Sequence, residues 1–552
     1  MNKILFIIPP NIEYDDFVNP PKNVKSIHKQ SGDYGVLITE IPLGILSLVS
    51  YVKKYSESEV EFKIIDFNII LNKLQNFEYK SFKEFFYEFL KKEIEEYNSP
   101  DIIGISSLFT PSYKSILEIA RCCREISQKS IIIAGGGVPT NMGKEIFRDS
   151  KDFDALCYGE GEKPLLNLVS AKNKAECLEN NSSWITQNKI KNNDKNYTYT
   201  NSLIENLDEI PPYNYSVLDL EGYKLNPTIL SYTFIENKQD SFPLMTSRGC
   251  PYYCCFCSSH SVHGRKMRYY SLRRVREDIK SLKDKYNARV IIFQDDHFMS
   301  DEKRAFQIID ILREFQITAF FPNSLALYTL KRKMLEALKS IGVNQLVLSI
   351  ESGSDRVLRE IMHKPLNLSI VKQVVNDCRL LNIYTDINLL IGLPGEKKQD
   401  IKDARAFLKT IGANWFRINV ATPLVGSEMF DICIKKNYFM GNYLECNYKR
   451  AMIETEDFTA EYIQEMAYIM NLELNFVYNS DFYLGDYDVA LKGFENAIKA
   501  KSDHALAYYY ASKCYEKLGN IEKAQEYLNN SKKIVSESPF WNKYFKMFNI
   551  PI

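Results

Sequence analysis

The sequence predicts an α/β protein with an N-terminal doubly wound parallel sheet, a central partial TIM-type (β/α)6 barrel and a C-terminal tail of helical repeats. Three observations predict this fold class: short apolar runs alternate with helical patterns up to about residue 170, a second such series starts near residue 240, and a repeat with an offset of 34 residues lies near the end. We expect five segments: the sheet domain at 1–175, a linker or irregular lobe at 176–238, the barrel at 239–432, a helical connector at 433–480 and the helical tail at 481–552.

The composition is that of an ordinary globular protein. Hydrophobic residues make up 45% and charged residues 25% of the 552 positions, and the formal net charge is zero. A neutral chain gives no electrostatic reason to bind nucleic acid or an anionic membrane. The N-terminal apolar run is too short for a signal peptide, and no run approaches the roughly 18 apolar residues of a membrane span. We therefore expect a cytoplasmic protein with no nucleic-acid partner.

Strands separated by helices indicate parallel βαβ units in the first segment. The expected strands are 4–8, 60–65, 102–106 and 131–134, and the expected helices are 42–51 and 112–126. Ligands of such sheets lie at the carboxyl ends of the strands. That rule predicts one rim formed by Ser106, Ser107, the glycines 135–137 and the run Gly159–Glu162.

The segment 176–238 shows no apolar period, and Asn and Lys dominate residues 180–201, so we expect a linker or a small irregular lobe. A second βα series follows it. Its expected strands are 243–247, 290–293, 319–321, 345–350, 384–391 and 415–421. Functional residues of a TIM-type barrel lie at the carboxyl ends of the strands.

The C-terminal repeat pairs Leu484-Gly485 with Leu518-Gly519, and Ala490 with Ala524. This pattern resembles tetratricopeptide helix pairs, with room for one full repeat and the start of another. Because about three repeats are needed for independent stability, we expect the tail to dock on the rest of the chain or on a partner.

Cys250, Cys254 and Cys257 stand in the run TSRGCPYYCCFC. Three thiolates on one short loop can bind three irons of a [4Fe–4S] cluster and leave the fourth iron open to a substrate. The alternative is a zinc site completed by His260 or His263. Cys255 lies off the ligand spacing, and we interpret it as a bystander. The other eight cysteines share no spacing and are expected to be small buried hydrophobes: Cys122, Cys123, Cys157, Cys177, Cys378, Cys433, Cys446 and Cys514.

The spacing Cys-x3-Cys-x2-Cys, with Phe256 before the last cysteine, resembles the signature of the radical S-adenosylmethionine (SAM) superfamily. The resemblance covers roughly residues 240–430. It implies that the three cysteines bind the cluster, that SAM chelates the open iron, and that a flavodoxin- or ferredoxin-type reductant drives cleavage of SAM to a 5′-deoxyadenosyl radical.

The same resemblance implies further contacts at the strand ends. It places Asp295 and Asp296 near the methionyl amino group, Glu351 and Ser352 against the ribose and methionine, and Phe256 beside the cofactor. It also assigns contacts to the loops 392–396 and 422–426. The alternatives are ordinary ones, because a strand-end Asp often caps a helix and a Gly-Pro run often forms only a turn.

The first segment is similar to the cobalamin-binding domain that precedes many radical SAM enzymes. The residues that carry the similarity are 42–44, 64–66, 101–107, 134–139 and 154–162. It implies corrin or nucleotide-tail contacts at Ser106, Ser107, Gly135, Gly136, Gly159 and Glu160. The six histidines include none in the pattern Asp-x-His-x-x-Gly, so cobalt would lack that ligand, which favours methyl transfer. The alternative is a sheet that binds nothing.

The basic stretch 264–276 follows the cysteine loop. Such a run is usually a solvated face, and the alternative is a docking patch for an acidic reductant.

These resemblances lead to the hypothesis of a cobalamin-dependent radical SAM methyltransferase that acts on an unactivated carbon. The helical tail suggests a peptide or a carrier-bound substrate. Two alternatives stay open: cyclisation or rearrangement without methylation, and a non-catalytic interaction protein built on the tail. A methylthiotransferase is disfavoured because the first segment has no second cysteine triplet. No catalytic base can be named.

Overall fold

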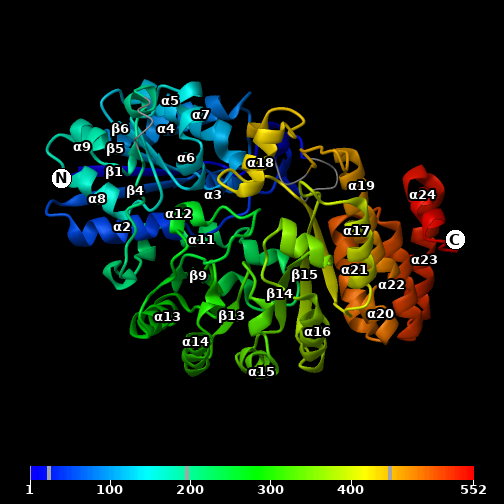
Figure 1. Ribbon diagram of the computed structural model, residues 1–552. Coiled ribbons are helices and arrows are strands. Elements are labelled where there is room, and N and C mark those ends of the chain that lie inside the picture. The colour runs from blue at the N-terminus through cyan, green and yellow to red at the C-terminus, as the bar shows by residue number, and fades with distance from the viewer. Residues whose placement is uncertain (1, 21–25, 193–197, 446–449, 552) are drawn as a thin grey trace.

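The computed structural model describes residues 2–20, 26–192, 198–445 and 450–551. The N-terminal α/β domain lies against the mouth of the barrel, and the helical tail packs beside the barrel, next to its last strand (Figure 1). This arrangement confirms the predicted fold class.

The N-terminal domain is built around a six-stranded sheet of order β4-β1-β5-β6-β7-β8, in which only β8 is antiparallel to its neighbour. Its elements are β1 Asn2–Ile8, α1 Tyr14–Val18, β2 Ser26–Lys29, β3 Gly32–Gly35, α2 Leu43–Tyr55, β4 Val60–Asp66, α3 Phe67–Lys73, α4 Phe82–Glu96, β5 Ile102–Ser106, α5 Tyr113–Ile126, β6 Ile131–Gly135, α6 Gly137–Asn141, α7 Gly143–Asp149, β7 Ala155–Cys157, α8 Glu162–Ser170, α9 Lys174–Asn180, β8 Trp184–Ile185 and α10 Gln187–Lys191.

Both faces of this sheet are covered, which explains why its strands are continuously apolar. Ile4 and Phe6 of β1 pack toward α2 and α8, whereas Leu5 and Ile7 pack toward α4 and α5. The side chains of one strand therefore divide between two cores, as the period of a strand requires.

The sheet continues past residue 175, into the segment expected to be a linker. Trp184 is buried in the core beneath α2 and α8, and β8 adds an antiparallel edge to β7. The two residues of this short strand are both buried, Trp184 in one core and Ile185 in the other, although the surrounding Asn- and Lys-rich sequence shows no periodicity. Residues 204–235 instead pack against the barrel.

The central domain contains six parallel strands in two three-stranded sheets, β9-β12-β13 and β14-β15-β16, and the described residues show no ladder between β13 and β14. Its elements are α11 Leu220–Tyr223, β9 Ser241–Leu244, β10 Ser247–Arg248, α12 His260–His263, β11 Arg268–Tyr269, α13 Leu272–Tyr286, β12 Val290–Phe293, α14 Glu302–Glu314, β13 Thr318–Phe320, α15 Arg332–Ser340, β14 Gln345–Glu351, α16 Val371–Leu380, β15 Tyr384–Ile391, α17 Lys398–Leu408, β16 Trp415–Val420 and α18 Glu428–Lys436.

The bounds predicted for the first barrel strand, 243–247, are wrong. β9 ends at Leu244, and Ser247–Arg248 forms a separate antiparallel pair with Arg268–Tyr269. The chain leaves the barrel here because Asp295 binds Thr246 and Ser247. The cysteine loop therefore follows β10 and not the first barrel strand.

The barrel interior is plugged by the segment that precedes β9. Ile229, Tyr232 and Ile235 pack against Ile292 of β12 and Val347 of β14. This segment thus covers the inward-facing apolar side chains of the strands, and the outer helices cover the outward-facing ones.

The tail consists of helices that pack in antiparallel pairs and dock on the barrel. They are α19 Ala460–Leu472, a π-helical turn Glu473–Val477, α20 Ser480–Leu484, α21 Tyr487–Ala500, α22 Ala505–Lys517, α23 Ile521–Glu537 and α24 Pro539–Met547. Trp415 of β16 packs into the tail core, and the Arg379 guanidinium lies 2.6 Å from the carboxylate of Asp481. Docking on the rest of the chain is therefore confirmed.

The scattered cysteines mostly follow expectation. Cys122, Cys123, Cys157, Cys378, Cys433 and Cys514 are buried, but Cys177 is only half-buried, and Cys446 lies outside the described residues. Cys177 sits on the outer helix α9, so one side of it stays open to solvent. Across the described ranges, no helix is both long and apolar enough to cross a membrane.

Candidate active site between the two α/β domains

Backbone contacts on both sides hold the cysteine loop. Gly249 adopts a φ of 95°, and a Cβ there would lie 2.4 Å from the Lys266 carbonyl oxygen, so only glycine fits. The Cys255 N–H donates to Met362 O at 3.0 Å, and its carbonyl accepts from Met429 N–H at 2.9 Å. The loop is therefore anchored through its bystander cysteine, which is 3% exposed.

The three predicted ligand cysteines are half-buried, whereas Cys255 is buried. Burial raises the pKa of Cys254 to about 11; Lys364 lowers it, and the neighbouring Cys257 and Cys250 thiols raise it. Burial likewise raises the pKa of Cys250, with Cys257 adding to the effect. The three sulfurs thus lie within electrostatic range of one another, and the raised pKa values of Cys250 and Cys254 make ionisation of these two thiols depend on the positive charge of bound iron.

Within the described residues, no three His, Cys, Asp or Glu side chains converge on a single-ion position. A cubane offers a separate iron to each thiolate, so ligands spread around a loop suit it. His263, one of the two candidate zinc ligands, instead directs Nδ1 to Glu160 Oε1 at 3.2 Å. The donor set fits the cluster, and Cys250, Cys254 and Cys257 would hold it.

The two strand-end aspartates support the loop. Asp295 is buried and accepts from the Thr246 and Ser247 hydroxyls at 2.7 and 2.5 Å. Asp296 accepts from the Gly249 N–H at 3.1 Å. Both carboxylates therefore position the chain that leads to Cys250, a role that the resemblance did not indicate for them.

Glu351 and Ser352 follow β14, as expected. Glu351 has a φ of 66° at a β-bulge, and its carboxylate lies 3.5 Å from the Lys364 ammonium group. Ser352 is buried, and its hydroxyl accepts from the Ser354 N–H. Of Glu351 and Ser352, only Glu351 is half-buried. Phe256 packs against the barrel core. The SAM contacts of all three residues stay predictions.

The predicted rim of the N-terminal sheet is assembled from three strand ends. Ser107 N–H donates to Gly135 O at 2.9 Å, and its hydroxyl bonds to Ser112. Gly136 has a φ of 110°, and a Cβ there would lie 2.3 Å from Ser107 O. Ser106 is half-buried beside them, and Asn201 covers Gly159. The backbone at Gly136 thus lies very close to the backbone at Ser107. Corrin contacts at the predicted rim residues stay predictions.

Apolar side chains stand exposed on the same edge. Leu108 and Phe109, directly after β5, are 65% and 57% exposed. Ile38, in the segment between β3 and α2, is 49% exposed, and its carbonyl accepts a hydrogen bond from the Asn11 side chain, just after the neighbouring strand β1. Exposed apolar clusters of this kind mark ligand surfaces. The edge therefore fits a large flat ring laid over the loops. His28, the one histidine of this domain, pairs with Asp33, in line with the missing Asp-x-His-x-x-Gly pattern.

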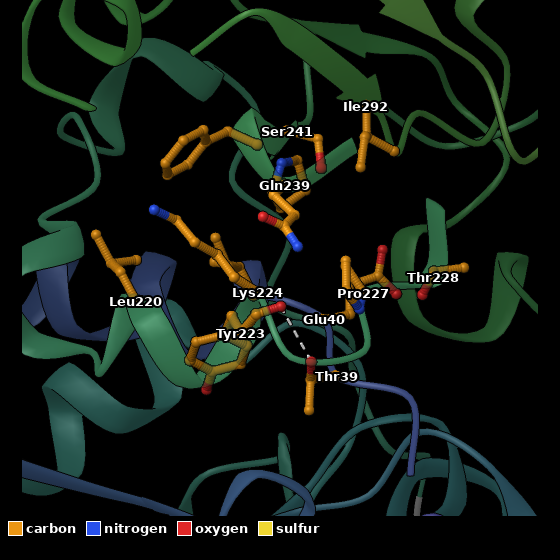
Figure 2. Close-up of a pocket in the computed structure, with 13 residues that line it drawn as sticks. Thr39, Glu40, Leu220, Tyr223, Lys224, Pro227, Thr228, Gln239, Ser241 and Ile292 are labelled. Carbon is orange, nitrogen blue, oxygen red and sulfur yellow. Dashed lines mark hydrogen bonds between the residues drawn. The ribbon is translucent and has the colours of Figure 1, made fainter. Parts of the chain in front are cut away.

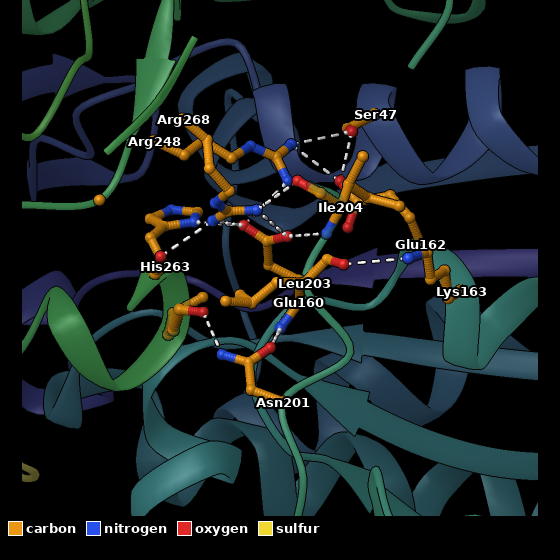
Figure 3. A network of polar contacts seen from close by, with 12 residues as sticks. Ser47, Glu160, Glu162, Lys163, Asn201, Leu203, Ile204, Arg248, His263 and Arg268 are labelled. Carbon is orange, nitrogen blue, oxygen red and sulfur yellow. Dashed lines mark hydrogen bonds and ion pairs between the residues drawn. The ribbon is translucent and has the colours of Figure 1, made fainter. Parts of the chain in front are cut away.

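A buried polar network joins this edge to the cysteine loop (Figure 3). The Glu160 carboxylate binds Arg248, Arg268 and His263. Burial acts to raise its pKa, but the charge of Arg248 and the hydrogen bonds with His263 and Arg268 hold that pKa well below the usual range. Glu160 was predicted to contact a cofactor, but its side chain is occupied by the barrel domain. Arg248 went unnoticed in the sequence, although its place two residues before Cys250 was a usable signal.

The basic stretch 264–276 is partly buried and partly a solvated face, and most of its cations are paired. Arg268 and Arg274 are buried and paired with Glu160 and Asp278. The exposed Lys266 and Arg276 bind Glu205 and Glu314. Most of its charge is therefore neutralised within the chain.

A small cavity of about 30 Å³ lies between loop 39–41, the segment 220–239 and strands β9 and β12 (Figure 2). Glu40 comes from the N-terminal domain, lines this cavity and accepts a hydrogen bond from Gln294, at the end of β12. Its side chain stays accessible to solvent, yet the surrounding protein raises its pKa to about 7 by desolvation. No sequence pattern marked Glu40.

Comparison with known proteins agrees with this geometry. Residues 244–408 match the Radical SAM superfamily, 41–169 the B12 binding domain and 482–538 a tetratricopeptide repeat. An uncharacterized methyltransferase, PH0819, of Pyrococcus horikoshii is 26% identical over 77% of this chain and 85% of its own length. Cytidylyl-2-hydroxyethylphosphonate methyltransferase of Streptomyces wedmorensis is 24% identical over 68% of this chain and 75% of its own.

Among solved structures, the cobalamin-dependent SAM radical enzyme OxsB, with aqua-cobalamin and SAM bound, matches with a TM-score of 0.61 at 14% identity. The match covers 100% of this chain and 82% of OxsB. The two proteins share a fold. A radical SAM domain uses a [4Fe–4S] cluster and SAM, and a B12 binding domain takes cobalamin, so these are the cofactors of this chain. The cysteine loop, the barrel and the preceding sheet thus identify the chain as a radical SAM enzyme with an N-terminal B12 binding domain.

Proposed function

We propose that the chain is a methyltransferase that moves a methyl group from SAM to an unactivated carbon. The observation that carries the proposal is the buried network that joins the rim of the B12 binding domain to the cluster loop. Two relatives that align over most of this chain are named methyltransferases, which supports the same activity.

When bound, the cluster supplies an electron that cleaves SAM, and the corrin carries a methyl group. The protein must bind and orient both and keep water from the radical. Cys250, Cys254 and Cys257 would hold the cluster, and the half-buried Glu351 at the barrel rim is the nearby carboxylate for SAM. Ile38, Leu108 and Phe109 offer the apolar surface for the corrin.

Glu40 supplies the polar group on the substrate side. In the described part of the chain it has no cationic partner: Gln294 is neutral, and Lys224, also on the cavity wall, pairs with Glu221. A carboxyl group with a pKa of about 7 can accept or donate a hydrogen bond near neutral pH. We infer that it orients a hydroxyl or amino group of the substrate.

The reductant is proposed to be a flavodoxin- or ferredoxin-type protein. The tail gives less support to a peptide or carrier substrate than its sequence suggested, because its inner face is already packed on Trp415 and β16. A carrier-bound substrate would have to reach the cavity from another side.

Anaerobic reconstitution with iron, sulfide, cobalamin and SAM tests the proposal. We expect 5′-deoxyadenosine and S-adenosylhomocysteine to form together after reduction. Failure to bind cobalamin would refute the proposal, and 5′-deoxyadenosine without S-adenosylhomocysteine would favour cyclisation or rearrangement instead.

A further inference from the structure

Four charged side chains form a closed buried cluster at the junction of the two α/β domains. Glu160 and Glu162 follow β7 of the B12 binding domain, and Arg248 and Arg268 come from the small β10–β11 sheet of the barrel domain. Each of the four side chains is at most 4% exposed. The two negative and two positive charges balance, as burial requires.

Arg248 lies two residues before Cys250 and spans both glutamates. Its Nη1 lies 3.2 Å from Glu160 Oε1, and its Nη2 lies 2.8 Å from Glu162 Oε1. The Ser47 hydroxyl, on α2, accepts from Nη2 at 3.1 Å and donates to Glu162 at 2.5 Å. The backbone that enters the cluster loop is thus joined to two elements of the other domain.

Arg268 completes the junction from the strand opposite Arg248. Its two terminal nitrogens bind the two oxygens of Glu160 at 2.9 and 2.7 Å, and they also donate to the carbonyls of Ile204 and His263. Because the guanidinium group binds the planar carboxylate through two hydrogen bonds, the orientation of the two side chains is fixed as well as their distance.

Further hydrogen bonds nearby also connect α12, after the cysteine loop, with the segments that face it. The Asn201 side chain accepts from Glu160 N–H at 2.9 Å and donates to Val262 O at 2.6 Å, within α12. The Asn141 amide of α6 donates to the Ser261 hydroxyl at 2.9 Å. The segment that follows the cysteine loop therefore has hydrogen bonds to the B12 binding domain at Ser261, His263 and Arg268.

Buried ion pairs seldom add stability over apolar packing, but they do specify one geometry. We propose that Glu160 and Glu162 are positioning residues that act through Arg248 and Arg268 to fix the cluster loop against the rim of the B12 binding domain. The distance between the two cofactors then follows from this junction. The consequence for methyl transfer rests on the proposed function; the effect on the loop does not.

Amide hydrogen exchange on the full-length, cofactor-free chain tests the loop directly. Glu162→Gln keeps the shape of the side chain and removes its charge. We expect at least about tenfold faster exchange in peptides covering residues 249–257, because the loop loses one of its anchors. The matched control is Glu473→Gln, which breaks a buried pair with Arg405 between the barrel and the tail. Equal loop exchange in the two variants would overturn the proposal.

If Glu162→Gln does not fold, Arg248→Lys provides the same test, because it keeps the charge but loses the two-pronged contact. A second readout uses reconstituted protein with SAM and a chemical reductant. We expect unchanged iron content but a fall of at least about fivefold in S-adenosylhomocysteine formed per 5′-deoxyadenosine. An unchanged ratio together with unchanged loop exchange would also overturn the proposal. Wild-type protein that forms no S-adenosylhomocysteine would refute the methyltransferase function alone, since the exchange result stands without it.

Discussion

The Asp295 carboxylate accepts hydrogen bonds from both the backbone N–H and the hydroxyl group of Thr246, at 3.1 and 2.7 Å. The pair joins the end of β12 to the segment that carries the chain from β9 toward the cysteine loop. Asp295 is 3% exposed, and burial raises its pKa, while hydrogen bonds from Ser247 and Thr246 oppose the shift. One buried acid thus shapes the approach to the cluster.

Replacing Asp295 with Asn should therefore loosen the cluster site. The amide offers one acceptor oxygen where several donors converge, so we expect a loss of about 1–3 kcal/mol in the free energy of unfolding. Iron content after reconstitution should fall as well. The control is Asp301→Asn: Asp301 accepts from the Arg304 N–H at the start of α14, and Asn caps a helix equally well. Equal iron content in both variants would contradict this role.

Cys254 and Cys255 are neighbours with opposite expected roles. Cys254→Ala should leave almost no iron on the protein, where the wild type holds about four irons in its cluster. Cys255→Ala should keep the iron and cost about 1 kcal/mol of stability, because a buried sulfur is lost from the core. Iron and acid-labile sulfide analysis of anaerobically purified protein distinguishes them. A Cys254→Ala protein with full iron content would remove the basis for the cluster assignment.

Local sequence patterns were sufficient wherever one segment determines its own structure. The strands at Val290–Phe293 and Tyr384–Ile391 have the predicted bounds, because each is a run that must be buried on both sides. The three cysteines were predicted as cluster ligands on the same kind of local evidence, their spacing within one loop, and that assignment stays a prediction.

Contacts between distant segments were not predictable. The path of Thr246 depends on Asp295, and the burial of Arg248 depends on Glu160 and Glu162, more than 80 positions earlier. Glu40 is a single acid in a loop, and nothing in its neighbourhood indicates that Gln294 will meet it. The site residues that sequence reasoning missed are those whose partners lie in the other domain.

Gly135 and Gly136 allow a matched test of the rim. Gly136→Ala forces a side chain onto a residue with a φ of 110° and places its Cβ against the Ser107 carbonyl, so we expect a loss of at least about 2 kcal/mol and weaker cobalamin binding. Gly135→Ala meets only Cys157, at 3.7 Å, and should be tolerated. Chemical denaturation and the absorbance of bound corrin measure the two effects. Equal cobalamin content in both variants would show that the close approach at Gly136 is not needed for binding.

Glu40 should make stability depend on pH. Its folded-state pKa of about 7 exceeds the ordinary value of 4.5, so the folded chain holds this proton more tightly than the unfolded chain. The contribution of Glu40 to stability therefore falls as pH rises from about 4.5 to about 7. Tyr232 and the paired Lys224 are the other ionisable groups that face it.

Glu40→Gln removes this dependence and leaves the other acidic groups unchanged. The Tm of the variant relative to wild type should be higher at pH 8 than at pH 5 by about 1–2 °C, measured at constant ionic strength. Glu57→Gln, at an exposed turn, is the control and should show no such trend. A flat difference for Glu40→Gln would place the pKa of this carboxyl group near its ordinary value.

Asn475 closes the outer edge of the barrel. Its amide accepts from the Phe416 N–H and donates to the Phe416 carbonyl, both at 2.8 Å, as a neighbouring strand would. Asn475→Leu leaves both backbone groups of β16 unpaired in a buried place, so we expect a loss of about 2–4 kcal/mol in the docking of the tail.

Limited proteolysis in increasing urea tests the docking, since the tail should become cleavable at lower urea in Asn475→Leu than in wild type. Asn479→Leu is the control: that buried amide caps α20 and bonds to Asn475 O, so its contacts stay within the tail. If the control releases the tail as easily, helix stability and not the bond to β16 decides docking. If only Asn475→Leu does, the last barrel strand is held by a side chain in place of a seventh strand.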